Sequence, residues 1–228
     1  MHIFSLISKK MTVQQRRRLR KTVSPFRRMG LHNKTFSLIS NNCWGGIVYD
    51  KFGLQYRTPT IGLLLGPSDY IKFVTHLSYY LSFDAVVDHS EDGKEVRNGN
   101  DNNLFYGKFG DIRLYFVHYR SAEDAVVKWK RRRKRVDLGN NNIFVELSDI
   151  SVAGEQLTDE EIGNFARLPY QKVFFTANKT WADKYQFAVL FHEIGSDGKL
   201  VNEFRESNSL FPLSRLKKTL NTLKNISK

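Results

Sequence analysis

Short apolar runs of strand length alternate with helix-like segments along most of this chain, and this alternation limits its possible folds more than any other feature. The runs occupy residues 35–40, 60–66, 111–119, 142–149, 172–178 and 186–191. Strands that alternate with helices are typical of α/β domains, in which helices connect strands that run in parallel. The sequence therefore predicts a single α/β domain over residues 35–228, with a mainly parallel or mixed sheet flanked by helices.

The segments between these runs carry the periodicity and the end signals of helices. The clearest begins at Pro67 and has an apolar stripe along one face. The stripe consists of Tyr70, Phe73, Val74, Leu77 and Leu81. Further helices are predicted at residues 47–52, 121–136, 158–168 and 213–226. The polar stretch 88–103 is predicted to form a loop or an exposed hairpin.

The net charge of +13 is concentrated in two basic segments. Residues 1–34 contain ten Lys or Arg and no acidic residue, and residues 128–135 contain seven more, so the rest of the chain is mildly acidic. We expect residues 1–34 to form a flexible or partly helical basic extension, because Pro25 and Gly30 interrupt it and it has no clean apolar face. Such segments attract the phosphates of nucleic acids, anionic lipids or phosphorylated substrates.

Cysteine content and hydropathy bear on where the protein works. Cys43 is the only cysteine, which excludes an internal disulfide bond and favours a reducing, cytoplasmic setting. The apolar stretch at residues 3–7 is too short for the core of a secretory signal, and no run approaches the roughly 20 apolar residues of a membrane span. We expect a cytoplasmic protein whose basic surfaces allow peripheral contact with the anionic inner leaflet of a membrane.

Polar side chains follow five of the predicted strands, at the points where the strands end. The five groups are Ser40–Cys43, Pro67–Asp69, His118–Arg120, Ser148–Asp149 and Asn178–Lys179. In an open parallel sheet, ligands bind at the carboxyl ends of the strands, where such groups would meet along one edge. Loops are polar for other reasons as well, so it is the coincidence of five groups that indicates a site.

The group after the first strand, SNNCWGG at residues 40–46, is the most unusual. Gly45 and Gly46 allow either a tight turn into a helix or close approach of the backbone to a ligand, and the helix N-terminus can hold an anion. The stretch is neither a GxGxxG fingerprint nor a P-loop. Cys43 is either a nucleophile, with His118 as its base, or a small packed residue. Trp44 either stacks on a sugar or base or closes the core.

His118 itself has two interpretations. It shares a strand face with Ile112, Leu114 and Phe116, which is typical of a core histidine bonded to a neighbouring carbonyl. It also stands where the strand ends, which would suit a general base or a ligand contact at the edge of the sheet.

The helix after Ser121 places one arginine on its buried side. Helical spacing puts Arg133 between Trp129 and Val136, and a guanidinium directed inward needs a carboxylate partner or a substrate phosphate. The remaining cations of the helix are expected on a solvated or membrane-facing surface. They are Lys128, Lys130, Arg131, Arg132, Lys134 and Arg135.

Metal and cofactor signatures are missing from the sequence. No His/Cys pair has the spacing of metal ligands, and there is no HExxH motif. The Asp-x-Asp signature of many metal-dependent glycosyltransferases is also absent. We therefore expect neither a metal site nor a cofactor.

Three stretches, at residues 36–73, 115–149 and 168–178, resemble in this order a family of bacterial proteins classed as a domain of unknown function. Many of its members are labelled exopolysaccharide biosynthesis proteins. The motifs are NNCWGG, a downstream TP, PSDYI, HY and a helix with W and RR, and the resemblance covers about residues 35–195. The matching positions include Ser40 to Gly46, Thr58, Pro59, Pro67, Asp69, Tyr70, His118, Tyr119, Trp129, Arg132 and Arg133. The resemblance implies an α/β fold and a role in capsule, exopolysaccharide or O-antigen assembly, but it brings no catalytic residues with it.

Taken together, these features favour a glycosyltransferase-like enzyme acting on a nucleotide-activated sugar or a lipid-linked glycan. The expected base is His118 or Asp69, and Cys43 is the expected nucleophile if an acyl group is transferred. The expected substrate-binding residues are Ser40, Asn41, Asn42, Trp44, Gly45, Gly46, Tyr119, Arg120, Arg133 and Asp149.

Two alternatives stay open. One is a non-catalytic assembly or regulatory protein of the same pathway. The other is a basic nucleic-acid-binding module, which is disfavoured because the charge is confined to a tail and one helix face and no recognised binding motif occurs.

Overall fold

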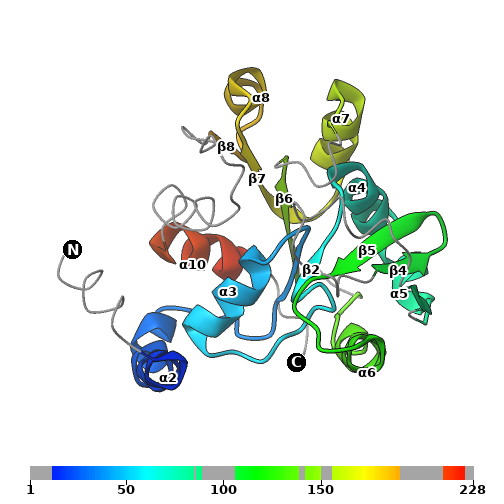
Figure 1. Cartoon of the computed structure of the whole chain (residues 1–228). Coiled ribbons are helices and arrows are strands. Elements are labelled where there is room, and N and C mark those ends of the chain that lie inside the picture. The colour runs from blue at the N-terminus through cyan, green and yellow to red at the C-terminus, as the bar shows by residue number, and fades with distance from the viewer. Residues whose placement is uncertain are drawn as a thin grey trace.

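The computed structural model describes residues 12–84, 86–88, 106–138, 142–149, 156–190 and 213–223. Its strands are β1 (Ser37–Ser40), β2 (Leu63–Leu64), β3 (Val86–Asp88), β4 (Tyr106–Phe109), β5 (Ile112–Phe116), β6 (Ile143–Ser148), β7 (Gln171–Thr176) and β8 (Ala188–Leu190). Its helices are α2 (Val13–Arg28), α3 (Trp44–Phe52), α4 (Pro67–Thr75), α5 (Leu77–Ser82), α6 (Ala122–Arg133), α7 (Asp159–Arg167), α8 (Lys179–Lys184) and α10 (Leu213–Thr222). Figure 1 shows their arrangement.

A four-stranded parallel sheet with helices on both faces forms the centre of the molecule, which confirms the predicted α/β class (Figure 1). The strand order is β1-β6-β7-β8, and all three strand pairs are parallel. Successive residues of a strand point to opposite faces: Leu38 packs with α3 and α10, whereas Ile39 packs with α4 and α7. The two apolar clusters that result cover the two faces of the sheet.

A second, antiparallel sheet with the order β2-β5-β4-β3 lies beside the first. The strands predicted at residues 60–66 and 111–119 belong to this second sheet, so the five polar groups do not all follow strands of one parallel sheet. Gly110 has φ +65° in the turn that joins β4 to β5, and strands joined by so short a turn must be antiparallel. The apolar pattern predicts a buried strand but carries no information on its direction.

Most predicted helices occur where their end signals place them. The N-cap side chains of Ser121 and Thr158 accept hydrogen bonds from backbone N–H groups in the first turns of α6 and α7. The helix predicted from Pro67 is broken at His76 into α4 and α5, although its whole apolar stripe is buried. The polar stretch predicted at residues 88–103 lies outside the described residues, apart from the end of β3.

The basic N-terminal segment contains a helix that packs on the domain. Ser24 of α2 is buried against Gly53, which ends α3, and the Arg28 guanidinium donates to the Gly53 carbonyl at 3.3 Å. From the other end of the chain, Lys217 of α10 donates to the Met29 carbonyl at 2.7 Å. None of the helices in the described part of the chain combines the length and apolarity needed to cross a lipid bilayer.

The hydroxyl of Tyr80 ties α5 to the β4–β5 hairpin. It donates to Oδ1 of Asp111 at 2.6 Å, and this bond is the main reason why the pKa of Asp111 lies below its ordinary value of 3.8. Replacing Tyr80 by Phe should raise the Asp111 pKa toward 3.8 and lower the free energy of unfolding by about 1 kcal/mol at neutral pH.

A carboxyl group whose pKa is lower in the folded than in the unfolded state stabilises the folded protein when the pH is above the unfolded-state pKa. This contribution is lost as the pH falls through the folded-state pKa. The part of the Tyr80→Phe effect that acts through Asp111 should therefore disappear as the pH falls from 3.8 through the lower folded-state value. NMR titration of the Asp111 carboxyl, together with urea unfolding at several pH values, measures both effects. An Asp111 pKa that is the same in the two proteins would contradict this account.

Candidate functional site

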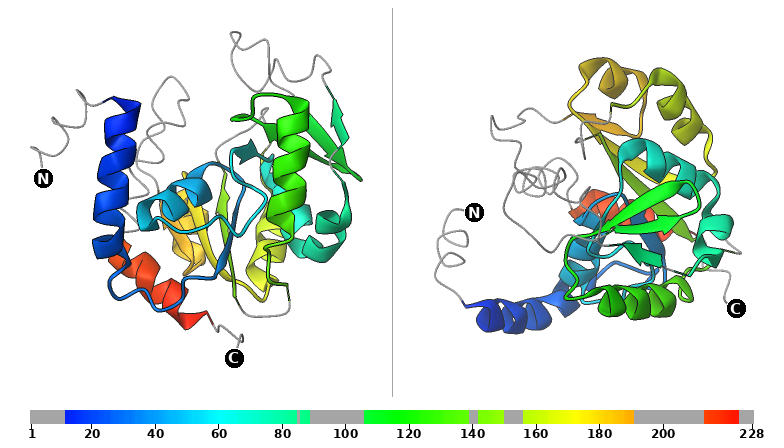
Figure 2. Two further views of the ribbon diagram at one scale, coloured as in Figure 1. Left: turned by 90° about the horizontal axis from the view of Figure 1, so that it is seen from below. Right: turned by 45° about the vertical axis from the view of Figure 1, so that its right-hand side comes forward.

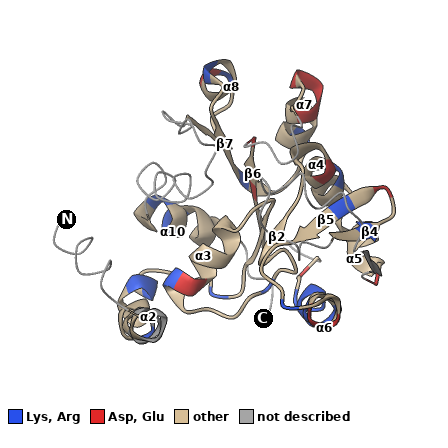
Figure 3. Cartoon of the chain, in the orientation of Figure 1, with Lys and Arg blue, Asp and Glu red and all other residues tan. Residues whose placement is uncertain are grey.

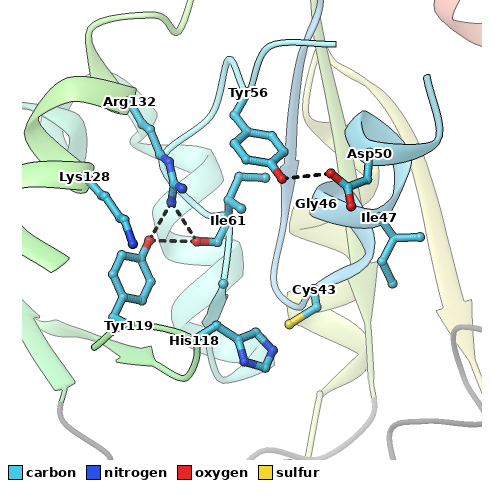
Figure 4. A pocket seen from close by; sticks show the side chains of 11 residues that line it. Cys43, Gly46, Ile47, Asp50, Tyr56, Ile61, His118, Tyr119, Lys128 and Arg132 are labelled. Carbon is cyan, nitrogen blue, oxygen red and sulfur yellow. Dashed lines mark hydrogen bonds between the residues drawn. The ribbon is translucent and has the colours of Figure 1, made fainter. Parts of the chain in front are cut away.

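A cavity of about 670 Å³ opens between the first turns of α3, the segment 56–62, the end of β5 and one side of α6 (Figure 4). This volume is within the range of about 300–1,000 Å³ that is usual for small-molecule sites. Its lining combines two cations, two tyrosines, a carboxylate, a thiol and an imidazole. These side chains belong to Lys128, Arg132, Tyr56, Tyr119, Asp50, Cys43 and His118.

Arg132 is the central side chain of the α6 wall. It is only 8% exposed, and its Nη1 donates to the Ile61 carbonyl at 3.0 Å and to the Tyr119 hydroxyl at 2.8 Å. Its guanidinium also lies over the rings of Tyr56 and Tyr119, 5.3 and 5.8 Å from their centres. Such stacking and bonding hold the planar guanidinium in one orientation.

Lys128 stands one helical turn before Arg132 and adds a second cation to this wall. Its Nζ lies 2.6 Å from Oδ2 of Asp124 and 5.1 Å from the centre of the Tyr119 ring. Burial raises the pKa of Tyr119 to about 12, so its hydroxyl keeps its proton and donates to the Ile61 carbonyl at 2.7 Å. The α6 wall is therefore a fixed, positively charged and aromatic surface.

The opposite wall comes from α3 and the segment that follows it. Asp50 is exposed on α3, and its Oδ1 accepts a hydrogen bond from the Tyr56 hydroxyl at 3.1 Å. Gly46 faces Ile61, and an added Cβ would lie 3.5 Å from that side chain. This wall offers a carboxylate and a hydroxyl, groups that suit the hydroxyls of a sugar.

Cys43 and His118 approach the cavity from different elements (Figure 4). Cys43 is the half-buried N-cap residue of α3. His118 follows β5 and is exposed, so of its two interpretations the core position is wrong. Gly62 explains the placement of His118, because its carbonyl accepts from the Val117 and His118 N–H groups. Gly62 has φ +75°, and a Cβ there would lie 3.2 Å from the Cβ of His118.

The SNNCWGG turn is built mainly from internal bonds. The Ser40 hydroxyl donates to the Asn42 carbonyl and accepts from the Gly45 N–H, both at 3.1 Å. The Asn41 amide donates to the Ser148 carbonyl at 2.8 Å and accepts from the Ser148 N–H at 3.0 Å, so it continues the pairing of β1 with β6. A Cβ at Gly45 would lie 2.5 Å from the Ser40 hydroxyl oxygen, which leaves no room for a larger residue.

Asn42 and Trp44 are buried in the same turn. The Asn42 amide donates to Oε1 of Glu146 at 3.1 Å, and its oxygen accepts from the Trp44 N–H at 2.8 Å. Trp44 is 2% exposed and packs on the rings of Phe144 and Phe175, so of the two alternatives for Trp44 the core position is confirmed.

Arg132 and Arg133 lie on the two flanks of Trp129, so they reach different neighbouring segments. Arg133 donates to the Leu81 and Ser82 carbonyls, and its Nη2 lies 2.7 Å from Oδ1 of Asp84, so the predicted carboxylate partner is confirmed. The prediction that Arg132 belongs to the outer surface is wrong. Val126 is apolar but only half-buried, so the buried side of α6 lies nearer to Arg132 than the apolar pattern of the sequence indicates.

The other predicted site residues do not line this cavity. Asp69 accepts from the Arg113 N–H at 2.9 Å, and burial raises its pKa. Arg120 is exposed before α6. Asp149 accepts from the Thr176 hydroxyl and the Ala177 N–H at the end of β6, and burial raises its pKa as well.

Of the residues predicted from the sequence, Cys43, Gly46, His118 and Tyr119 meet at the cavity. Sequence reasoning missed Asp50, Tyr56, Lys128 and Arg132. The one available signal was the four-residue spacing of Lys128 and Arg132 on one side of a helix. The described residues contain no group of three or more His, Cys, Asp or Glu that could hold a metal ion.

Comparison with known proteins gives one family and one relative. The family model described as a domain of unknown function (DUF1919) matches residues 14–219, a range that begins within α2. A protein of Haemophilus influenzae described as uncharacterized is 28% identical over 147 residues. The match covers 64% of each chain, so it spans less than two thirds of that relative.

Proposed function

We propose that this chain, which belongs to the DUF1919 family of domains of unknown function, is a transferase of surface polysaccharide assembly. Its substrate would be a nucleotide-activated sugar or a lipid-linked glycan, used in making capsule, exopolysaccharide or O-antigen at the cytoplasmic face of the membrane. Both substrate classes place a phosphate or diphosphate next to a sugar. The site must therefore satisfy negative charge and sugar hydroxyls together.

The observation that carries this proposal is the pairing of two different walls across one cavity. Lys128 and Arg132 supply positive charge on one side, and Asp50 with Tyr56 supplies hydrogen-bonding groups on the other. A phosphate matches the first wall, and sugar hydroxyls match the second. The two walls adjoin at Tyr56, whose ring lies under Arg132, and the presence of both chemistries at one cavity favours a glycosyl phosphate over a simple inorganic anion.

His118 and Cys43 are the reactive groups proposed for this site. An exposed imidazole can accept the proton of an acceptor hydroxyl as it attacks the donor sugar. Arg132 and Lys128 would stabilise the negative charge that develops on the departing phosphate. If the transferred group is an acyl group, Cys43 is the nucleophile and His118 its base. Asp69 has no role in this proposal, because it is bonded to the backbone of β5 away from the cavity.

Donor binding is the direct test. Thermal-shift and calorimetric titration with UDP-, GDP-, CMP- and dTDP-sugars should show stabilisation by at least one donor. Lys128→Met should weaken that donor about 10- to 100-fold, the range expected for losing a hydrogen bond to a charged group. Lys130→Met is the matched control, since Lys130 is on the same helix but exposed and outside the cavity.

Two results would count against this function. The absence of a shift with any donor would remove nucleotide-activated sugars as ligands, and equal weakening by Lys128→Met and Lys130→Met would remove the cavity as their site. A donor that binds but is not turned over with any acceptor would instead favour a non-catalytic assembly or regulatory role.

A further inference from the structure

Two basic helices, α2 and α6, lie along the same side of the molecule. Both are seen nearly end-on at the lower edge of Figure 1, and the view from below in Figure 2 shows α3 between them. Figure 3 shows Lys and Arg on both helices. Each helix packs on the domain by one side, which leaves its other side facing outward.

The outward side of α6 is basic and carries exposed apolar residues. Ala125 and Trp129 are fully buried on the inner side. The residues opposite them are spaced three or four apart, so they share one face. They are Val127, Lys130, Arg131 and Lys134, all exposed, with exposed Leu138 just after the helix. Glu123 lies at the start of the same face. The positive charge of this face is therefore concentrated in the second half of α6.

The outward side of α2 is more apolar. Ser24 points inward to Gly53, while Leu19 and Phe26 share the outward side with a spacing of seven residues. Leu19 is 42% exposed, and Phe26 and Met29, which follows the helix, are both 68% exposed. These side chains belong to a segment, residues 1–34, that contains ten basic and no acidic residues.

We propose that this α2–α6 face, made of Leu19, Phe26, Met29, Val127, Lys130, Arg131, Lys134 and Leu138, binds the surface of an anionic lipid bilayer. Helices that lie in the interface bury apolar side chains at the boundary of headgroups and acyl chains, while Lys and Arg bind the lipid phosphates. The α2–α6 face has both kinds of side chain, and they belong to two helices on the same side of the molecule. Binding to the surface of an anionic bilayer requires this combination.

The same residues argue against two other occupants. A nucleic acid would be bound by the cations, and its bases could stack on Phe26 and Arg131, but it would gain little from Met29, Val127, Leu19 and Leu138, which have no aromatic or guanidinium plane. A second copy of this chain would bring two positively charged faces together, which is repulsive. The lipid surface is the occupant that uses both the charge and the apolar groups.

This inference goes beyond the proposed function and holds without it, because it concerns a face and not a reaction. The α2–α6 face and the cavity of the proposed function are also close to each other in the structure. The cavity is lined by α3, which packs on α2, and by the side of α6 next to its outward face. Docking of the α2–α6 face would therefore keep the cavity close to the headgroup layer.

Vesicle flotation with the full chain tests the proposal. We expect binding to phosphatidylcholine vesicles that contain phosphatidylglycerol, and much weaker binding to phosphatidylcholine alone. Binding should fall as salt rises from about 0.1 M to about 1 M, where the Debye length shortens from about 10 Å to about 3 Å. Lys130→Gln/Arg131→Gln should weaken binding about 25-fold, at about fivefold for each cation near the surface.

Matched control variants test whether the loss of binding is specific to the α2–α6 face. They distinguish it from an effect of lower net charge and from the loss of any exposed aromatic side chain. Lys179→Gln/Lys184→Gln removes the same charge from α8, at the opposite edge of Figure 1, and should leave binding unchanged. Phe26→Ser/Met29→Ser should weaken binding, whereas Tyr79→Ser, at an exposed aromatic on α5, should not. All of these positions are on the surface, so the variants should fold, which circular dichroism confirms.

Four results would overturn the proposal. The first is equal binding to neutral and anionic vesicles, and the second is an equal loss of binding in the α8 control. Another is a dimer in ultracentrifugation that Phe26→Ser/Met29→Ser dissociates, which would assign the face to a second copy. The last is binding to nucleic acid that competes with vesicles and is insensitive to Phe26→Ser/Met29→Ser, which would assign the cations to that partner.

Discussion

Replacing Trp129 by alanine should lower the free energy of unfolding by about 3–5 kcal/mol, the range for removing a large buried aromatic side chain. Trp129 is fully buried, and its ring contacts Phe73 of α4 and Phe109 of β4. Its indole N–H donates to the Phe83 carbonyl at 3.1 Å. The residue therefore holds α6 against both α4 and the antiparallel sheet, and chemical unfolding monitored by circular dichroism measures its contribution.

Trp129→Phe is the matched control. It keeps an aromatic ring and loses the hydrogen bond to Phe83, so it should cost clearly less than the alanine variant. Because Arg132 is held by the same helix, Trp129→Ala should also disturb the cavity, while Trp129→Phe should leave donor binding largely intact. Equal losses of stability in the two variants would show that the hydrogen bond, and not the packing, is the main contribution.

Replacing Asn42 by alanine should cost about 3 kcal/mol of folding free energy, because a hydrogen bond to a buried carboxyl group is lost and a buried backbone N–H loses its acceptor. Asn42 donates to Glu146, which is fully buried, and accepts from the Trp44 N–H. The expected defect is one of stability. Where the variant is folded, its affinity for a donor in the cavity should stay within a fewfold of wild type.

A double-mutant cycle with Glu146→Gln checks the cause of this loss. If the amide of Asn42 acts through the carboxyl group, Asn42→Ala should cost less in the Glu146→Gln background than in the wild type. Additive losses would place the effect instead in the hydrogen bond that the Trp44 N–H donates to the side-chain oxygen of Asn42. A folded Asn42→Ala protein of normal stability that binds no donor would assign Asn42 to the ligand and contradict the structural role.

Local signals were enough to predict most of the strands and helices. The β6 segment shows why: four of its six residues are apolar, at Ile143–Val145 and Leu147, and they do not alternate regularly with polar ones, which is the pattern of a strand covered on both faces. Thr158 indicated the start of α7 as an N-cap residue, and in the structure Thr158 and Glu161 bond each other's backbone N–H groups. The direction of β5 was not predictable from its own residues, because it depends on pairing with β4 across a tight turn.

The cavity was harder to predict than the fold. Arg132 and Tyr56 are 76 positions apart in the chain and meet only because the 56–62 segment crosses in front of α6. Residues 56–59 of that segment have neither helical nor strand periodicity, so nothing in the sequence indicates where the side chain of Tyr56 points. The asparagines of the SNNCWGG turn present the opposite case. Their amides suit a ligand chemically, but the backbone of β6 and the side chain of Glu146 already occupy them.

The contact between α10 and the segment after α2 has a consequence for the order of folding in the cell. Asn221 donates to the Gly30 carbonyl and accepts from the His32 N–H, so it joins positions 191 and 189 residues apart. A growing chain cannot make these bonds until residue 221 has left the ribosome. Although domains tend to fold during synthesis, this one can complete the contacts of the segment after its first described helix only once α10 has emerged.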